Sequence, residues 1–366
     1  MRTRVAIIHD NLLEFGGSEQ VLLSLLKLYP DAELYTFFVN LENPQIKDRF
    51  GKYHWHTFFI QSLPGLAHLQ QYFSLLKPLA WWYFAKLDLQ GYDLVITSCH
   101  SYNSKMVKVQ KGAKHLCYLY TPPRFLYGFA HELERFTRLP FANHLLSIFK
   151  QIDQKAAQNP HQIIVSSKEV QSRVMRIYGR KSLVVSPPVS QLSTKITQQK
   201  EYYVAHSRLV KQKNIELIVA ACTRYNLPLK VVGDGYLRND LERNTGKSVQ
   251  FLGFVPDQKL ARVYRSARAL IYAADDEDFG IVPVEAQSAG VPVIAYRSGG
   301  VTETIVNGVT GYFFNELTIE SMMKAVRKLE RAPLSSLECR MQAKKFNHTR
   351  FMKDMKSVIQ DLLTTP

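Results

Sequence analysis

Two glutamates that stand eight positions apart, Glu277 and Glu285, lie on either side of a glycine turn at Gly280. The turn leads into an expected helix, whose start leaves the backbone N–H groups of Gly280, Ile281 and Val282 without helical partners. These N–H groups point out of the helix start, where the helix dipole also favours negative charge. The stretch therefore predicts an anion site flanked by two carboxylates.

A second stretch carries two cations, Arg208 and Lys213. Arg208 offers a planar fork of donors, and Lys213 offers a compact positive charge beside an expected helix start. This pair suits a diphosphate. An ordinary basic loop on the surface is the alternative at this point.

The elements around the two glutamates have the pattern of an open α/β sheet. Residues 269–273 predict a short buried strand, and residues 282–289 predict a helix that stops at Gly290. A second strand follows at 292–296. Glu277 is then expected in the loop outside the first strand and Glu285 one turn into the helix, where ligands bind in such sheets.

The first half of the chain alternates strands and helices in the same way. A strand at 5–8 leads through a loop to Gly16 and Gly17, and a helix opens directly behind them. These glycines let the backbone approach a ligand closely, although a plain tight turn has the same sequence. His100 lies just past a second buried strand at 93–97. A histidine at a strand end is structural in many proteins, so its role stays open here.

The strand and helix pattern predicts two domains with a C-terminal helix. The first domain is placed at residues 1–190, the second at 201–340, and a basic helical segment at 341–366. The polar stretch 189–200 lacks a sustained apolar period and is interpreted as the linker. The second domain restarts with a strand at 202–205, and a later strand ends in a turn at Gly233.

The composition is that of a folded protein, with 366 residues, 46% of them hydrophobic. The four cysteines are scattered without metal-ligand spacing, so we expect neither a metal site nor a disulfide framework, and reduced thiols favour a cytoplasmic location. No apolar run reaches the roughly 18 residues of a membrane span, and the first apolar run is too short for a signal peptide.

The formal net charge of +16 indicates an anionic partner, but no nucleic-acid motif accompanies it, so we expect no nucleic acid. Residues 56–90 are rich in Phe, Leu and Trp and predict one or two helices with an aromatic side. Core packing explains such a side, and so does a surface that touches a membrane or a lipid-linked acceptor.

The stretch from Glu277 to Glu285, with Phe279-Gly280 and Pro283 inside it, resembles the E-x7-E motif of the retaining glycosyltransferases of family four. The resemblance implies an α/β fold with two Rossmann-like domains facing across a cleft, known as GT-B. It also implies that Glu277 faces the donor hexose and that Glu285 holds the ribose hydroxyls of a sugar nucleotide.

Other motifs extend this resemblance over nearly the whole chain. The loop Gly16-Gly17-Ser18-Glu19 is similar to the family's glycine loop beside the donor diphosphate, and Arg208 and Lys213 match its phosphate-binding pair. The resemblance implies that His100 contacts the donor sugar. The implied catalytic residues are His100, Glu277, Arg208 and Lys213, and the implied donor-binding residues are Gly16, Gly17, Arg208, Lys213, Gly233, Phe279, Gly280, Ile281, Val282 and Glu285.

Two positions depart from the family's pattern. His206 stands where the family has glycine two positions before the arginine, which puts the local backbone geometry in doubt. Tyr120 stands where the relatives have histidine before Thr-Pro, so any role of that histidine is in doubt, while Arg124 suits either an acceptor phosphate or a structural ion pair.

The resemblance is strongest to the bacterial mannosyltransferases that build surface polysaccharides. It implies transfer of a hexose, mannose from GDP-mannose first of all, to a glycan or polyprenyl-linked acceptor, with retention, no metal and no cofactor. From the reduced thiols, the positive charge and the aromatic stretch we expect a cytoplasmic enzyme at the inner face of the membrane, with peripheral contact to anionic lipid. A sugar-nucleotide epimerase of the same fold and a non-catalytic binder of anionic polymer or membrane are the alternatives.

Overall fold

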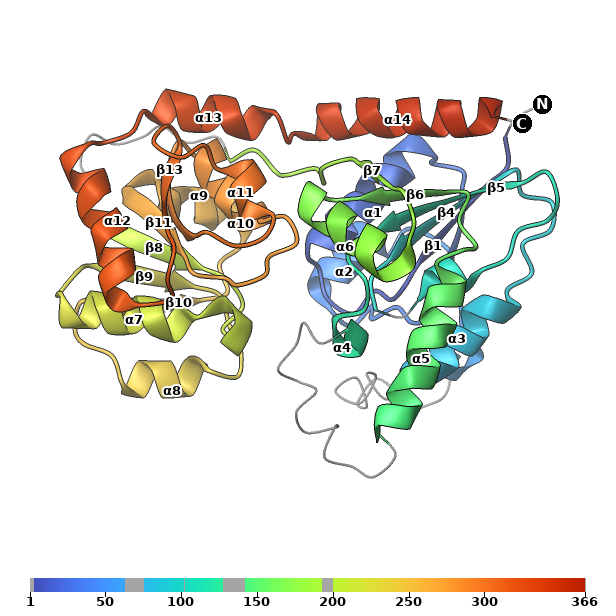
Figure 1. The fold of residues 1–366 in the computed structure, drawn as a ribbon, viewed down its shortest axis with the longest axis horizontal. Helices are drawn as coiled ribbons and strands as arrows, with labels where there is room; N and C mark the ends of the chain where they lie inside the picture. The colour runs from blue at the N-terminus through green and yellow to red at the C-terminus, as the bar shows by residue number, and fades with distance from the viewer. Residues whose placement is uncertain (1–2, 63–75, 102, 128–141, 193–199, 366) are drawn as a thin grey trace. The chain divides into compact units, whose positions relative to one another are not determined.

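The computed structural model describes residues 3–62, 76–101, 103–127, 142–192 and 200–365. The chain divides into two compact units (Figure 1). Unit 1 comprises Met1–Pro188 together with Phe351–Pro366, and unit 2 comprises Val189–Arg350. Each unit is built around one parallel sheet of its own.

Unit 1 contains a seven-stranded parallel sheet in the order β3-β2-β1-β4-β5-β6-β7. The chain first moves outward from β1 to β3, and then restarts at β4 beside β1, so the strand order reverses between β1 and β4. The first four residues of β1 are all buried, as expected for a parallel sheet covered on both faces. The strands are β1 (Val5–His9), β2 (Glu33–Thr36), β3 (Trp55–Thr57), β4 (Leu94–Cys99), β5 (Lys114–Leu119), β6 (Gln162–Val165) and β7 (Leu183–Val184).

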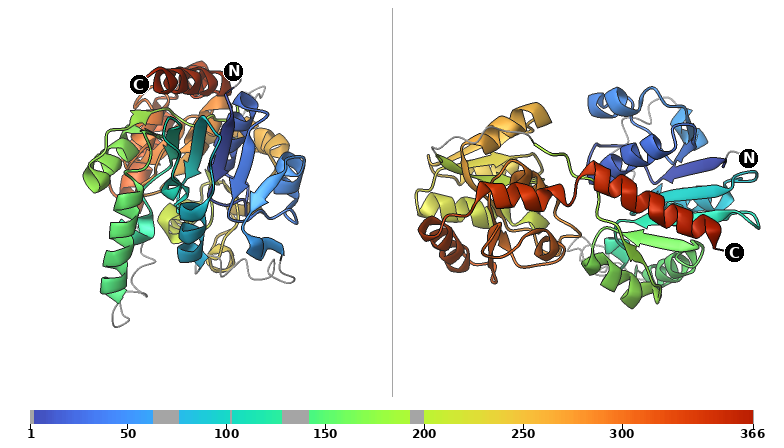
Figure 2. Two further views of the ribbon diagram at one scale, coloured as in Figure 1. Left: turned by 90° about the vertical axis from the view of Figure 1, so that its right-hand side faces the viewer. Right: turned by 90° about the horizontal axis from the view of Figure 1, so that it is seen from above.

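Helices pack on both faces of this sheet. Val5 and Ile7 of β1 point into a core shared with α1, α2 and α14, whereas Ala6 and Ile8 point into a core shared with α3. Figure 2 shows α14 and α3 on opposite sides of the strands. The helices are α1 (Gly17–Leu28), α2 (Pro44–Phe50), α3 (Lys77–Lys86), α4 (Arg124–Tyr127), α5 (Ala142–Ala156), α6 (Lys168–Tyr178) and α14 (His348–Thr364), with short 3-10 turns η1 (Phe59–Ser62) and η3 (Ser104–Met106).

Unit 2 contains a six-stranded parallel sheet in the order β10-β9-β8-β11-β12-β13. Here the strand order reverses between β8 and β11, because the chain moves outward from β8 to β10 and then restarts beside β8. The strands are β8 (Tyr202–His206), β9 (Leu229–Val232), β10 (Val249–Gly253), β11 (Ala267–Tyr272), β12 (Val293–Tyr296) and β13 (Gly311–Phe314).

The two faces of the second sheet are covered by different helices. One core joins Tyr203 and Ala205 of β8 to α7, α8 and α12, and the other joins Tyr202 and Val204 to α9, α10 and α11. The helices are α7 (Ile215–Arg224), α8 (Arg238–Arg243), α9 (Asp257–Arg265), α10 (Ile281–Ser288), α11 (Val301–Thr304), α12 (Ile319–Arg331) and α13 (Ser336–Lys344), with the 3-10 turn η5 (Lys211–Lys213) before α7.

The two Rossmann-like α/β sheets predicted from the sequence are confirmed. The helix expected at 282–289 is α10, and Gly290 behind it has the left-handed φ of 80° that the stop signal implied. Of the one or two helices expected over 56–90, the described residues contain α3, which follows β3 and η1. Residues 63–75, and most of the expected linker, lie outside the described residues.

Among the described residues, no helix has the length and apolar character required to cross a membrane. All four cysteines are buried and free. The C-terminal helix α14 belongs to unit 1 by its packing, since Phe351, Met355 and Ile359 insert into the core beneath α1.

Candidate functional site

The reversal point of the unit 2 sheet gathers the residues predicted to hold an anion. Arg208 and Lys213 follow β8, while Glu277 and α10 follow β11, the strand that pairs with β8. Both segments leave the carboxyl ends of adjacent parallel strands, which is where ligands bind in open α/β sheets. The fold therefore brings Arg208, Lys213 and Glu277 to one edge, although 64 positions separate the last two along the chain.

Glu277 is held by two donors at the same oxygen. Lys213 Nζ lies 2.5 Å and the Tyr272 hydroxyl 2.7 Å from Oε2 of Glu277. Burial and the charge of Glu277 both raise the pKa of Tyr272, so the phenol keeps its proton and donates it to the carboxylate. The side chains of Lys213 and Glu277 are each 18% exposed, which leaves the pair accessible to a ligand.

Tyr272 was not among the residues predicted from the sequence. It is the last residue of β11, and the apolar residues before it are typical of an ordinary buried strand. Only the fold turns its hydroxyl to Glu277, five positions later in the chain.

Arg208 projects from the loop directly behind β8. Its side chain is exposed and makes no hydrogen bond or ion pair with the described residues. Its backbone is fixed, because the Arg208 carbonyl accepts from Val210 N–H at 3.0 Å and Leu209 N–H donates to Asp234 at 2.8 Å. An open guanidinium on a fixed loop is suited to bidentate binding of a phosphate.

The start of α10 has the backbone geometry of an anion site. Gly280 precedes the helix with a φ of 89°, and a Cβ there would lie 2.8 Å from Val301. Ile281 and Val282 supply the amides of the first turn that have no acceptor within the helix, since Pro283 has no N–H. Glu285 is half-buried one turn into the helix, as predicted.

Phe279 has a structural part in this loop. Its side chain is 4% exposed and packs edge-to-face on Phe346, with ring centroids 5.4 Å apart. Any contact of Phe279 with a ligand would therefore be through its backbone. Its predicted place among the donor-binding residues stays a prediction.

A second glycine pair, Gly299 and Gly300, packs against the backbone of the Glu277 loop. A Cβ at Gly299 would lie 2.2 Å from the carbonyl oxygen of Glu277, and one at Gly300 would lie 2.4 Å from that of Asp278. Gly300 N–H donates to the Glu277 carbonyl at 2.7 Å. The sequence signal for this contact is the Gly-Gly pair behind β12. The sequence alone does not show which residues the pair contacts.

Gly233 also lies too close to a neighbouring backbone segment to carry a side chain. Its φ is 116°, and a Cβ there would lie 1.9 Å from the carbonyl oxygen of Ser207, the residue before Arg208. The glycine thus lets β9 end against the Arg208 loop. Its predicted contact with a nucleotide stays a prediction.

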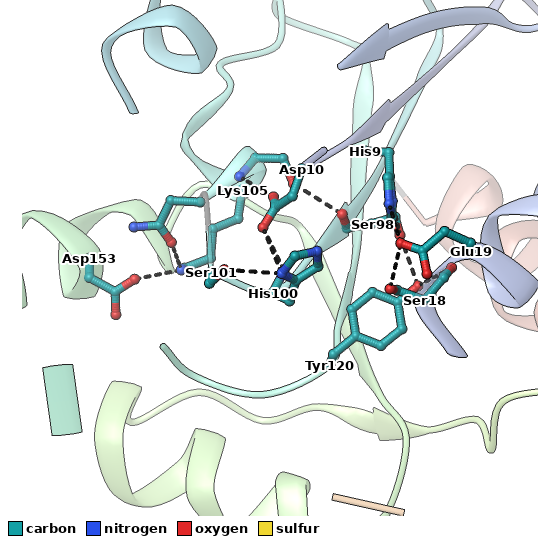
Figure 3. A network of polar contacts seen from close by, with 12 residues as sticks. His9, Asp10, Ser18, Glu19, Ser98, His100, Ser101, Lys105, Tyr120 and Asp153 are labelled. Carbon is teal, nitrogen blue, oxygen red and sulfur yellow. Dashed lines mark hydrogen bonds and ion pairs between the residues drawn. The ribbon is translucent and has the colours of Figure 1, made fainter. Parts of the chain in front are cut away.

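In unit 1 the predicted glycine loop also lies at a reversal point, behind β1 and beside β4. Gly16 is the N-cap of α1, and its N–H donates to Oε2 of Glu19 at 2.8 Å. Burial opposes ionisation of Glu19, but the hydrogen bond and charge of His9 hold the pKa of that carboxyl below its usual value. The loop that contains Gly17 is therefore fixed by an ionised carboxylate (Figure 3).

His100 follows β4 at the same edge and is tied to Asp10 (Figure 3). The backbone N–H of His100 donates to Asp10 Oδ2 at 2.9 Å, and its Nδ1 lies 3.7 Å from the same oxygen. Burial lowers the pKa of His100, while the charge of Asp10 opposes that shift. The histidine side chain is 27% exposed, which leaves part of its ring open to a ligand.

Tyr120, which stands where the family that this sequence resembles has histidine, turns its hydroxyl inward. The hydroxyl lies 2.9 Å from Ser98 Oγ and donates to the Ser18 carbonyl at 3.0 Å. Tyr120 thereby braces the glycine loop from the end of β5. Arg124 begins the short helix α4 and is half-buried.

Residues 189–346 match the family model described as "Glycosyl transferases group 1". This segment contains the whole Arg208–Lys213–Glu277 edge. The matched segment lies within unit 2, which comprises Val189–Arg350.

Curated relatives match stretches of different length. A sulfoquinovosyl transferase of Arabidopsis thaliana is 30% identical over 138 residues, which is 36% of this chain and 27% of that protein. The chain thus spans about a quarter of the length of that relative. An alpha-1,3/1,6-mannosyltransferase of Dictyostelium discoideum is 21% identical over 324 residues, 75% of this chain and 76% of that protein.

Solved structures show the fold of the whole chain. The Anabaena protein HepE in complex with UDP and glucose superposes with a TM-score of 0.73 at 16% identity, covering 99% of this chain and all of that one. Sucrose-phosphate synthase from Thermosynechococcus elongatus gives a TM-score of 0.73 at 18% identity over both entire chains. The two units together have the GT-B fold.

Proposed function

We propose that this chain is a retaining glycosyltransferase that transfers a hexose from a sugar nucleotide to a glycan or polyprenyl-linked acceptor. The observation that supports this most is the placement of Arg208 and of the Lys213–Glu277 pair at one sheet edge, within the segment that the glycosyltransferase family model matches. A guanidinium, an ammonium and a carboxylate at one sheet edge match a ligand that has both phosphates and hydroxyls.

The residues suggest how the leaving group is stabilised. Breaking the bond between hexose and diphosphate moves negative charge onto the phosphates, and Arg208, Lys213 and the first amides of α10 are the groups that would bind that charge. Glu277, fixed by Lys213 and Tyr272, would orient the hexose hydroxyls. We propose front-face attack by the acceptor, a route that needs no covalent nucleophile from the protein.

We propose mannose from GDP-mannose as the donor, in the synthesis of a surface polysaccharide. The similarity to the Dictyostelium mannosyltransferase supports the hexose. UDP-sugars are the competing donors, because HepE was solved with UDP and glucose.

A thermal-shift screen of GDP-mannose, UDP-glucose, UDP-galactose and UDP-N-acetylglucosamine tests the proposal. Binding of one donor at 100 times its Kd adds about 2.7 kcal/mol of stability and raises Tm. We expect the largest shift with GDP-mannose, followed by acceptor-dependent release of GDP. Conversion of the sugar nucleotide without acceptor would instead indicate an epimerase, and no shift with any donor would favour a non-catalytic binder.

We also propose that unit 1 makes a peripheral contact with anionic membrane at the inner face of the cytoplasmic membrane. Two large aromatic side chains of the predicted aromatic stretch are exposed, Phe59 at 66% and Trp82 at 54%. Flotation with vesicles containing anionic lipid tests this, and we expect Trp82→Ala to reduce the bound fraction. Equal flotation of both proteins would contradict a role of Trp82.

A further inference from the structure

His206 ends β8 on the face of the sheet that α9 and α10 cover. Along β8, Tyr202 and Val204 pack into the core beneath these helices, while Tyr203 and Ala205 pack into the opposite core. The alternation of side chains along a strand puts His206 on the same side as Tyr202 and Val204. It stands two residues before Arg208, at the carboxyl edge where the predicted diphosphate site begins.

One nitrogen of His206 is occupied and the other is open. Nδ1 lies 3.0 Å from the hydroxyl of Tyr264, a fully buried residue of α9. Nε2 makes no hydrogen bond with the described residues. The buried polar atoms without a partner in that part of the chain do not include Nε2, so this nitrogen is open to solvent. Burial lowers the pKa of His206 to about 4, so the imidazole is neutral near pH 7.

The charge of Glu285 also acts on Tyr264. Burial raises the pKa of the Tyr264 hydroxyl, and the negative charge of Glu285 raises it further. His206, Tyr264 and Glu285 come from β8, α9 and α10 respectively. β8 and β11 are paired parallel strands, so His206 and the start of α10 lie at the carboxyl ends of adjacent strands.

We propose that Nε2 of His206 binds a ribose hydroxyl of the donor nucleotide, with Tyr264 as the positioning residue that fixes the ring. This inference rests on the proposed function. A neutral imidazole contributes a directed hydrogen bond but no charge, which suits a hydroxyl better than a phosphate. Glu285, which lies in the helix after the adjacent strand β11, is the residue that the sequence resemblance assigns to the ribose, whereas the charged Arg208 is proposed to hold the phosphates.

Two substitutions separate ligand binding from a structural role. The amide of His206→Asn takes the place of Nδ1 and keeps the bond to Tyr264, but it has nothing at the Nε2 position. The amide of His206→Gln reaches the Nε2 position and loses the bond to Tyr264. Isothermal titration with GDP and with UDP measures the affinity of each protein for the nucleotide that the wild type binds more tightly.

We expect His206→Asn to raise Kd about fivefold, as for the loss of one neutral hydrogen bond, and His206→Gln to stay within about twofold of the wild type. With the 2′-deoxy or the 3′-deoxy nucleotide, whichever lacks the bound hydroxyl, the wild type and His206→Asn should bind equally. Tyr264→Phe keeps the ring but not the tether, and we expect about a twofold rise in Kd.

The outcomes distinguish the two proposals. If the wild type binds neither GDP nor UDP, the proposed function fails and this inference fails with it. If the wild type binds but His206→Asn binds as tightly, only the inference fails. A Kd that rises for His206→Gln and not for His206→Asn would show that the imidazole acts only through its bond to Tyr264. That result would also overturn the inference that Nε2 binds the nucleotide. Should the Asn variant not fold, Tyr264→Phe and the deoxynucleotides decide the question.

Discussion

The hydroxyl of Tyr272 donates to Oε2 of Glu277 at 2.7 Å, from the last residue of β11 to the loop five residues later. The same carboxylate oxygen accepts from Lys213. Glu277 is thus fixed from the sheet by a neutral donor and from the β8 side by a charged one. Removing one donor should loosen the carboxylate without removing its charge.

Tyr272→Phe should lower turnover about tenfold, the rate equivalent of about 1.4 kcal/mol, because Glu277 loses the donor that orients it. The diphosphate contacts of Arg208 do not involve the phenol, so KM for the donor should change much less. Steady-state kinetics with the donor identified by the thermal-shift screen measure both. Tyr296→Phe, on the neighbouring strand β12, is the matched control and should leave both constants unchanged. Equal effects of the two variants would contradict the positioning role.

Arg208→Ala should raise the Kd of the nucleoside diphosphate at least about tenfold, equivalent to about 1.4 kcal/mol, because a phosphate loses its bidentate partner. Lys211→Ala removes another exposed cation of the same loop and should change Kd less than about twofold. Titration at two salt concentrations checks both variants. Comparable losses in the two would mean that the loop attracts anions only through its general charge.

Gly299→Ala should destabilise the protein more than Gly308→Ala. Both glycines have positive φ, 61° and 79°, so an alanine costs about 1–2 kcal/mol at either position. Only at Gly299 does the new Cβ also meet the backbone of Glu277, whereas at Gly308 it meets open space. We expect the larger fall in Tm, and a loss of donor-induced Tm shift, for Gly299→Ala. Equal falls in Tm would show that the close approach relaxes at no cost.

Acid should destabilise unit 1 through His115, a fully buried residue of β5. Burial lowers its pKa to about 3, whereas the unfolded chain takes up the proton below about pH 6.5. The unfolded state therefore binds one more proton between these values, and stability falls as the pH drops from 6.5 towards 3, by about 1.4 kcal/mol per pH unit.

His115→Gln should consequently lose less Tm than the wild type between pH 6.5 and pH 4.5. His144→Gln, at an exposed position on α5, should follow the wild-type profile. Thermal unfolding across that range compares the three proteins. Parallel pH profiles for His115→Gln and the wild type would contradict the assignment of this histidine.

Much of the architecture can be predicted from the amino-acid sequence. The apolar runs at 5–8 and 202–205 predicted β1 and β8, and the glycine stop behind residues 282–289 predicted the end of α10. These predictions succeeded because buried parallel strands and helix ends depend on residues that are close in the chain. The strand β13 and the β3–η1 opening of the aromatic stretch were not predicted, since their short runs carry no clear period.

The amino-acid sequence by itself determined which chemical groups this protein has available, namely a guanidinium, an ammonium, two carboxylates and a glycine turn, and that they follow strands of an α/β chain. Only the tertiary structure decided which of them meet. The reversal of strand order between β8 and β11 put Lys213 against Glu277, and packing of distant segments turned Tyr272 towards Glu277, Tyr264 towards His206, and Phe279 into the core. Such contacts depend on long-range pairing and side-chain packing, which local sequence patterns do not specify.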